Sequence, residues 1–101
     1  MELEKTKLMI DLLDLYGLLL TDNQLEIMQC YYMDDLSLSE IGENLNITRS
    51  AVYDAIKKST KLLLSYEEKL KLLEKEEKLK KIINESYNLS KDELIEELKS
   101  L

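Results

Sequence analysis

Apolar residues recur every three or four positions through most of the chain, which is the spacing of amphipathic helices. In the first segment, residues 3–19, two apolar lines run side by side: Leu8, Leu12, Leu15 and Leu19, and Met9, Leu13, Tyr16 and Leu20. Together they make an apolar face wider than a helix needs to cover one core. We therefore expect this helix to be buried on one side by its own domain and on the other by a second subunit.

Three capping boxes predict where further helices begin. In this motif a Ser or Thr side chain and a Glu or Gln three residues later each accept a hydrogen bond from the other residue's backbone amide. The pattern occurs at residues 21–24, 37–40 and 90–93. We expect the second helix to end near Met33 and the third near Leu45.

Residues 36–58 have the pattern of a helix-turn-helix, two short helices joined by a tight turn. Gly42 lies inside the first of them, where it costs about 1 kcal/mol relative to Ala. Close approach of the next helix would explain why a glycine stands at this position. Asn46 stands where the turn needs a positive φ, which Asn tolerates better than most residues. Thr48 then caps the second helix.

The helix that follows the turn is predicted to be long. Its buried face should be formed by Val52, Ala55, Ile56 and Ser59. A seven-residue apolar repeat continues this pattern through Leu63 and Leu70, and no breaker occurs before Asn84. We expect one helix from Thr48 to about Asn84, roughly 55 Å long at 1.5 Å per residue. A break at residues 86–89 and a short terminal helix should follow.

The composition supports an all-α fold. Pro, Phe and Trp are absent, Gly occurs only at positions 17 and 42, and Leu, Lys and Glu dominate. Such a mixture of helix formers without helix breakers is typical of all-α proteins. We predict a helical helix-turn-helix domain over residues 1–65 and a helical C-terminal extension over residues 66–101.

The net charge of −7 is distributed unevenly. Residues 1–36 carry −6 and residues 37–65 carry +1, so the predicted helix-turn-helix is the only net-positive part. Because non-specific binding to nucleic acid comes from neutralising phosphates, this weak surplus argues against strong non-specific binding.

The N-terminus predicts neither a leader peptide nor a membrane anchor. It begins with acidic residues and has no basic region before its apolar stretch, unlike a secretory signal. The most apolar run, residues 8–20, is interrupted by Asp11 and Asp14 and is shorter than the roughly 20 residues that span a bilayer. We expect a soluble, cytoplasmic protein.

The side chains needed for most catalytic sites are missing. There is no His, the single Cys30 cannot form a cluster, and no glycine-rich loop is present to hold phosphate. The carboxylates fall in amphipathic patterns that explain them as solvated helix faces. We expect a protein that is not an enzyme and has neither a cofactor nor a metal site.

The candidate nucleic-acid-binding residues lie at the start and on the outward face of the helix after the turn. They are Thr48, Arg49, Ser50, Tyr53, Lys57, Lys58 and Lys61. Arg49 could bond a guanine edge or a phosphate, or pair with a nearby acid. The lysines could contact phosphates or form a solvated side, and Tyr53 could reach a base or pack on the second helix. Asp54 on the same face would repel phosphate unless it accepts a hydrogen bond from a cytosine amine.

The motif resembles two known families. The pattern of Leu36, Ser37, Glu40, Ile41, Thr48, Arg49 and Val52 is similar to the last DNA-binding region of bacterial sigma factors. A closer resemblance, over about residues 15–72, is to the YlxM family of small helix-turn-helix proteins. It is carried by LYGLLLTDNQ, YYMDDLSLSEI, ITRSAVYDAIKK and LLSYEEKL, in that order.

The YlxM resemblance implies an all-α homodimer with a sigma-like helix-turn-helix, a long following helix and a short terminal one. It also implies a gene neighbourhood shared with the GTPase of the signal recognition particle. The inferred role is a regulatory or accessory protein of that targeting pathway, with the particle's RNA or GTPase as partner. The alternative is a DNA-binding transcriptional regulator. The motif residues that carry over are Thr48, Arg49, Val52, Tyr53, Asp54 and Lys57.

Overall fold

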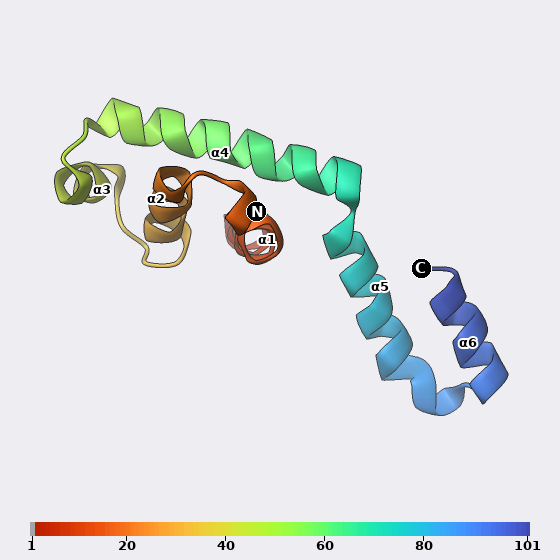
Figure 1. The fold of residues 1–101 in the computed structure, drawn as a ribbon. Helices are drawn as coiled ribbons and strands as arrows, with labels where there is room; N and C mark the ends of the chain where they lie inside the picture. Colours follow the sequence, from red (N-terminus) through yellow and green to blue (C-terminus); the bar gives the residue numbers. More distant parts are fainter. Residues whose placement is uncertain (1) are drawn as a thin grey trace. The chain divides into compact units, whose positions relative to one another are not determined.

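The structure is a computed structural model that describes residues 2–101, and all of its regular elements in that range are helical (Figure 1). This confirms the predicted all-α class. In chain order the elements are α1 (Glu2–Tyr16), η1 (Gly17–Leu19), α2 (Asp22–Tyr32), α3 (Leu38–Leu45), α4 (Arg49–Leu70), α5 (Leu72–Glu85), η2 (Ser86–Asn88) and α6 (Lys91–Lys99), where η marks a 3₁₀ helix.

All three predicted capping boxes form, at the starts of α2, α3 and α6. Before α3, for example, the amide of Glu40 donates to Ser37 Oγ over 3.1 Å, and the amide of Ser37 donates to Glu40 Oε1 over 3.0 Å. These bonds satisfy amides that a helix N-terminus otherwise leaves unpaired. The local sequence therefore fixes where these three helices begin.

The prediction of one continuous helix from Thr48 to Asn84 is wrong, because the helix breaks at Lys71. This residue has φ 54° and ψ 35°, the left-handed conformation that costs a residue with a Cβ about 1–2 kcal/mol. A continuous helix would place Ile82 roughly 100° around its axis from Leu63. Leu63 and Ile82 would then lie on different faces of one helix. The break allows α4 to bury the face of Leu63 and α5 to bury the face of Ile82.

The chain forms two compact units, one ending at Leu70 and the other spanning Lys71–Leu101. The first, the N-terminal unit, contains α1 to α4, and the second, the C-terminal hairpin, contains α5, η2 and α6. The sequence suggested separate domains over residues 1–65 and 66–101, and independent folding of the two parts stays a prediction.

The core of the N-terminal unit is built around α4, which packs against α1, α2 and α3. Three of the four residues of its predicted inward face, Val52, Ile56 and Ser59, are buried, as is Leu63, whereas Ala55 is half-buried. The other helices contribute Met9, Leu12, Leu13, Tyr16, Leu20, Ile27, Met28 and Ile41. None of the helices that the structure describes is long and apolar enough to span a bilayer.

The two apolar lines of α1 and η1 have different environments. The line of Met9, Leu13, Tyr16 and Leu20 is buried, together with Leu12. In the other line Leu8 is 37% exposed and Leu19 is 56% exposed, and the neighbouring Leu18 is 93% exposed. One side of this helix is thus covered by its own unit, as predicted, while cover of the other side by a second subunit stays a prediction.

Tyr16 ties the end of α1 to the last turns of α4. Its ring is buried, and the centroid of the ring lies 6.0 Å from that of Tyr66. Its hydroxyl donates a hydrogen bond to Glu67 Oε1 over 2.6 Å. A short hydrogen bond to a carboxylate is stronger than one between neutral groups. Tyr16 is therefore a core residue of the N-terminal unit.

Gly42 is required by the turn between α3 and α4. A Cβ at this position would lie 2.8 Å from the carbonyl oxygen of Ile47 and 3.5 Å from the amide nitrogen of Arg49. Both are backbone atoms, which cannot move without displacing the turn. A close backbone approach therefore explains Gly42, but the turn makes it through the carbonyl of Ile47, whereas the expected next helix lies at an ordinary van der Waals distance through Arg49.

We predict that Gly42→Ala lowers the free energy of unfolding by about 1–3 kcal/mol, because the clash outweighs the roughly 1 kcal/mol that Ala gains in helix propensity. Urea denaturation followed by circular dichroism measures the change. Asn44→Ala, at an exposed position of the same helix, is the control and should be neutral or slightly stabilising. A Gly42→Ala protein as stable as the parent would contradict the close approach.

Candidate nucleic-acid interface

The helix-turn-helix is formed by α3, a three-residue turn and the first half of α4. Asn46 adopts φ 58° and ψ 45°, the left-handed conformation predicted for it. The amide of Ile47 then donates to the carbonyl of Gly42 over 2.9 Å, which closes the end of α3. This tight turn directs the chain immediately into α4 and holds the start of α4 beside α3.

Thr48 caps α4, as predicted. Its Oγ1 accepts a hydrogen bond from the amide of Ala51 over 3.0 Å, and its carbonyl accepts from the amide of Val52 over 3.1 Å. The hydroxyl is still able to donate its own proton, so the cap and a contact to a phosphate oxygen are compatible. The amides at this helix end carry partial positive charge.

The first turn of α4 contains no acidic residue, whereas those of α2, α3, α5 and α6 each contain at least one. In those helices the acid offsets the positive end of the helix dipole. In α4 no acid of the first turn offsets the positive end of the helix dipole. Arg49 and Ser50 occupy this turn instead. The start of α4 is therefore electrostatically suited to an anion such as phosphate.

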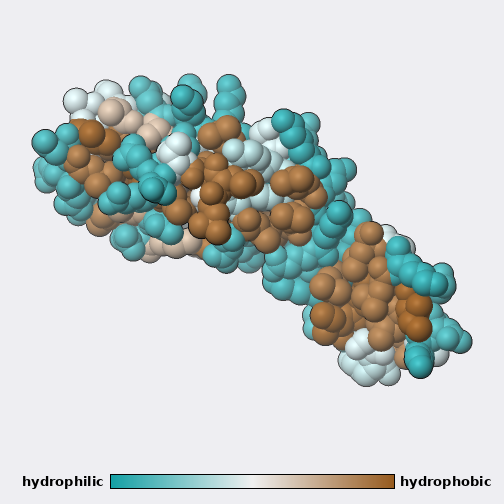
Figure 2. Space-filling model, viewed as in Figure 1, coloured by the Kyte–Doolittle hydropathy of each residue, from teal (hydrophilic) through white to brown (hydrophobic). Residues whose placement is uncertain are grey.

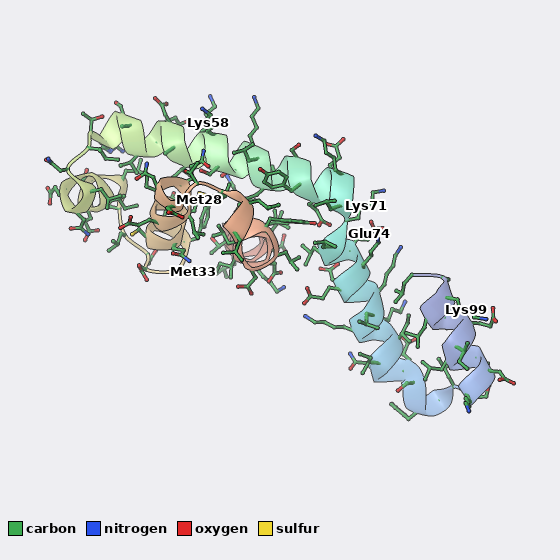
Figure 3. All side chains as sticks on the ribbon, in the orientation of Figure 1. Met28, Met33, Lys58, Lys71, Glu74 and Lys99 are labelled. Atoms are coloured by element: carbon green, nitrogen blue, oxygen red, sulfur yellow. The ribbon has the colours of Figure 1, made fainter. Side chains whose placement is uncertain are left out.

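The predicted contact residues all lie exposed, away from the core. Opposite the buried stripe of α4, the structure exposes Thr48, Arg49, Ser50, Tyr53, Lys57, Lys58 and Lys61. Figure 3 shows Lys58 on the side of α4 that faces away from α1 and α2. Tyr53 is 55% exposed, so it extends outward and is not packed into the core.

The four basic residues of this face are free of ion pairs within residues 2–101. No salt bridge in that range involves Arg49, Lys57, Lys58 or Lys61, whereas other lysines pair with acids one helical turn away. The alternative in which Arg49 forms an ion pair with a nearby acid is thus not found among the described residues. A ligand phosphate would meet these cations without displacing an existing partner.

A concavity of about 490 Å³ lies where α3 and α4 meet. It is lined by Leu38, Arg49, Ser50, Tyr53 and Asp54. Leu38 was not recognised from the sequence, although it directly follows the cap of α3, and the geometry of a helix-turn-helix brings that end close to the start of α4. Asp54 lines the same concavity as Arg49, so its negative charge partly offsets the positive charge of the arginine there.

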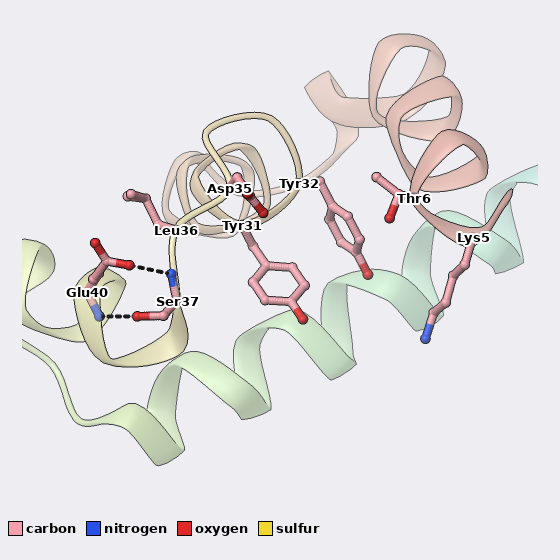
Figure 4. A pocket seen from close by; sticks show the side chains of 8 residues that line it. All are labelled: Lys5, Thr6, Tyr31, Tyr32, Asp35, Leu36, Ser37 and Glu40. Atoms are coloured by element: carbon pink, nitrogen blue, oxygen red, sulfur yellow. Dashed lines mark hydrogen bonds between the residues drawn. The ribbon is translucent and has the colours of Figure 1, made fainter. Parts of the chain in front are cut away.

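A second cleft, of about 550 Å³, lies between the N-terminal part of α1, the end of α2 and the start of α3 (Figure 4). The rings of Tyr31 and Tyr32 meet edge to face there, with centroids 4.8 Å apart. Burial raises the pKa of Tyr32, and hydrogen bonds to Ser37 lower the pKa of Glu40. Since Glu40 stays ionised and Asp35 also lines the cleft, it is poorly suited to phosphate.

In the part of the chain that the structure describes, carboxylates and one thiol are the potential metal ligands. No group of three His, Cys, Asp or Glu side chains there is placed to hold an ion. The single thiol, Cys30, is half-buried, and its burial together with Asp34 and Glu26 raises its pKa. A raised pKa leaves less of the reactive thiolate at neutral pH.

Comparison with known proteins gives a consistent result. The model of the family UPF0122, described as "Putative helix-turn-helix protein, YlxM / p13 like", matches residues 3–101. A UPF0122 protein of Lactococcus lactis subsp. cremoris is 45% identical over 106 residues, which covers 97% of this chain and 96% of the relative.

Two further relatives come from other genera. A UPF0122 protein of Clostridium acetobutylicum is 49% identical over 86 residues, covering 82% of this chain and 74% of the relative. One from Mycoplasma capricolum is 45% identical over 101 residues, covering 98% and 89%. The match extends through both units, and the described fold contains the helix-turn-helix that the family description names. The chain belongs to the UPF0122 family of YlxM / p13-like proteins.

Proposed function

We propose that this protein binds nucleic acid through α4 and acts as a regulatory protein in the cytoplasm. The observation that carries the proposal is the outward face of α4, where Arg49, Lys57, Lys58 and Lys61 are exposed and unpaired within residues 2–101. The acid-free first turn of the same helix supports it. The preferred target is double-stranded DNA, because a helix-turn-helix places its second helix in the major groove.

The residues of the exposed face would have different roles according to their position along α4. Arg49, Ser50 and Tyr53 lie in the first turns, which in this motif approach the base edges. Arginine bonds a guanine edge in a bidentate way, and serine can bond any base. The three lysines lie further along the helix, where they would contact the backbone phosphates and fix the register of the protein on the duplex.

The charge distribution implies that such binding is modest and strongly dependent on salt. Residues 37–65 carry only +1, and residues 1–36 carry −6. The acidic part would repel the duplex everywhere except where α4 faces it. The protein would therefore depend on orientation and on base contacts more than a strongly basic DNA-binding protein does.

We predict a measurable salt dependence of duplex binding. If Arg49 also meets a phosphate, so that all four cations of each subunit are used, a dimer would neutralise about eight phosphates, and the slope of log K against log salt would be about −7. Fluorescence anisotropy of a labelled duplex from about 50 to 200 mM salt measures it. Lys57→Ala should change the slope by about one in each subunit, whereas Lys91→Ala on α6 should leave it unchanged. Absence of binding even near 50 mM salt would reject the proposal.

Asp54 provides a second test. Asp54→Asn removes a negative charge from the exposed face of α4 and keeps a similar shape, so duplex affinity should rise about two- to fivefold, the effect of one exposed charge. The same anisotropy titration measures it, with Asp14→Asn on the exposed side of α1 as the matched control. A fall in affinity would instead mean that Asp54 contacts the target, for example a cytosine amine.

A second candidate function is an accessory role in the signal recognition particle pathway, with the particle's RNA or GTPase as partner. The resemblance to the YlxM family motivates it. A near-neutral helix-turn-helix with an exposed Asp54 is also compatible with a protein partner. Purified protein mixed with the GTPase and the RNA should then elute as one complex from a sizing column at micromolar concentrations. Separate elution of all components would exclude this role.

A further inference from the structure

The cleft that contains Tyr31 and Tyr32 has no part in the binding proposed for α4. It has a volume of about 550 Å³, and its lining comes from α1, α2, α3 and the segment between α2 and α3. Small-ligand sites in proteins are clefts of roughly 300–1,000 Å³, lined by aromatic side chains and a few well-placed polar groups. This cleft has the size and both kinds of side chain.

The lining of the cleft differs from the exposed apolar surface elsewhere in the chain. Figure 2 shows hydrophobic side chains gathered over the C-terminal hairpin. In the cleft, Leu36 is the one aliphatic side chain among the described residues that line it, and the others are tyrosines, hydroxyl residues and charged residues. Such a lining selects a ligand by charge and by aromatic contact.

Two carboxylates line the cleft, those of Asp35 and Glu40. Hydrogen bonds with Ser37 lower the pKa of Glu40, so this group is ionised at neutral pH. Neither acid forms a salt bridge within residues 2–101. A cation that enters the cleft would therefore meet two carboxylates without displacing an existing partner.

The capping box before α3 holds Glu40 in a fixed position. Its Oε1 accepts a hydrogen bond from the amide of Ser37 over 3.0 Å (Figure 4). An ionised carboxylate has about four acceptor sites and can take two hydrogen bonds from one arginine. The cap uses one of these sites, so the carboxylate is positioned for a ligand and still has acceptors to offer.

The two tyrosine rings add aromatic surface to these charges. Their planes are 86° apart and their centroids 4.8 Å apart, so the rings form two walls of a corner. An edge-to-face pair leaves both faces of one ring open to other contacts, and Tyr31 is 36% exposed. The face of an aromatic ring attracts a cation. Tyr31 and Tyr32 thus favour the same class of ligand as the two acids.

The one basic residue of the lining, Lys5, lies at the other end of the cleft. Figure 4 shows Tyr31 and Tyr32 between Glu40 on one side and Thr6 and Lys5 on the other. Opposite charges at the two ends would orient a ligand. Its cationic group would lie at the acidic end, and a carboxylate or carbonyl of the same ligand would lie toward Lys5.

A guanidinium group fits this lining better than an ammonium group or a metal ion. Guanidinium is planar and weakly hydrated, stacks on aromatic faces and pairs with carboxylates through two parallel hydrogen bonds. An ammonium group is a compact and strongly hydrated charge. A metal ion such as Ca²⁺ takes oxygen ligands on all sides, which two carboxylates and two rings do not provide.

We propose that this cleft is a binding site for a guanidinium group. The group lies against the rings of Tyr31 and Tyr32 and pairs with the carboxylates of Asp35 and Glu40. Its source is arginine, either as the free amino acid or as a side chain of a polypeptide. The inference does not rest on nucleic-acid binding by α4, whose exposed basic residues lie outside the cleft.

Amide NMR spectra of the isotope-labelled full-length protein test the proposal. The probes are the peptide acetyl-Gly-Arg-Gly-amide and free L-arginine, each titrated to millimolar concentration. Both should shift the amides of residues 31–40 in a saturable way. The same peptide with citrulline, which has the shape of arginine without its charge, should bind at least tenfold more weakly. The tighter of the two arginine probes identifies the source of the group.

Two variants remove the acidic charges and keep the local structure. In Glu40→Gln the new side chain still completes the capping box. In Asp35→Asn the new side chain tolerates the positive φ of 55° at this position. Each should weaken arginine binding about two- to fivefold, the effect of one exposed charge. Asp34→Asn, at the neighbouring exposed acid outside the cleft, is the matched control and should leave the affinity unchanged.

Three results would overturn the proposal. They are the absence of saturable shifts with both arginine probes, equal binding of the citrulline peptide, and an unchanged affinity in both Glu40→Gln and Asp35→Asn. Circular dichroism of the variants should match that of the parent, which separates lost binding from lost folding. Duplex binding is measured in a separate titration, so either proposal can fail while the other holds.

Discussion

The buried stripe of α4 is the constraint on which the rest of the N-terminal unit depends. Val52, Ile56 and Leu63 pack against three other helices, and this packing sets the rotation of α4 about its axis. Because the buried side is fixed, the opposite side must expose Arg49 and the lysines. Ser59 is fully buried on the same stripe, and its hydroxyl has no hydrogen-bond partner among the described residues. A buried hydroxyl without a partner costs free energy, so Ser59 contributes to the packing of this stripe through its small volume and not through its hydroxyl.

Local chemistry explains why the helix-turn-helix could be predicted from the sequence. Capping boxes, a left-handed Asn46 and a glycine at a close backbone approach each act within a few residues, so one stretch of sequence contains all the partners. The same holds for the outward position of the basic residues, which follows from the helical period of Val52 and Ile56. The sequence could also predict the short terminal helix, because its cap at Ser90 is local.

Features that depend on distant partners could not be predicted in this way. The break at Lys71 has no Gly or Pro to signal it, and it arises because α4 and α5 pack in different units. The ion-pair state of Arg49 depends on which acids the fold brings near it. The cleft at Tyr31 and Tyr32 requires three helices to meet, and the hydrogen bond between Tyr16 and Glu67 joins two helices that are distant in the sequence. Helical periodicity alone shows which residues share a face, without showing what covers that face.

Charge and assembly together limit how such a protein can bind a polyanion. One copy offers four exposed cations on α4, set against a first third of the chain that carries −6. Since each neutralised phosphate contributes to affinity, a single helix-turn-helix of this charge is a weak binder at physiological salt. Joining two copies doubles the cations that can engage one duplex, and linkage raises the effective concentration of the second motif. A pair of copies would therefore supply the affinity that the charge of a single α4 cannot.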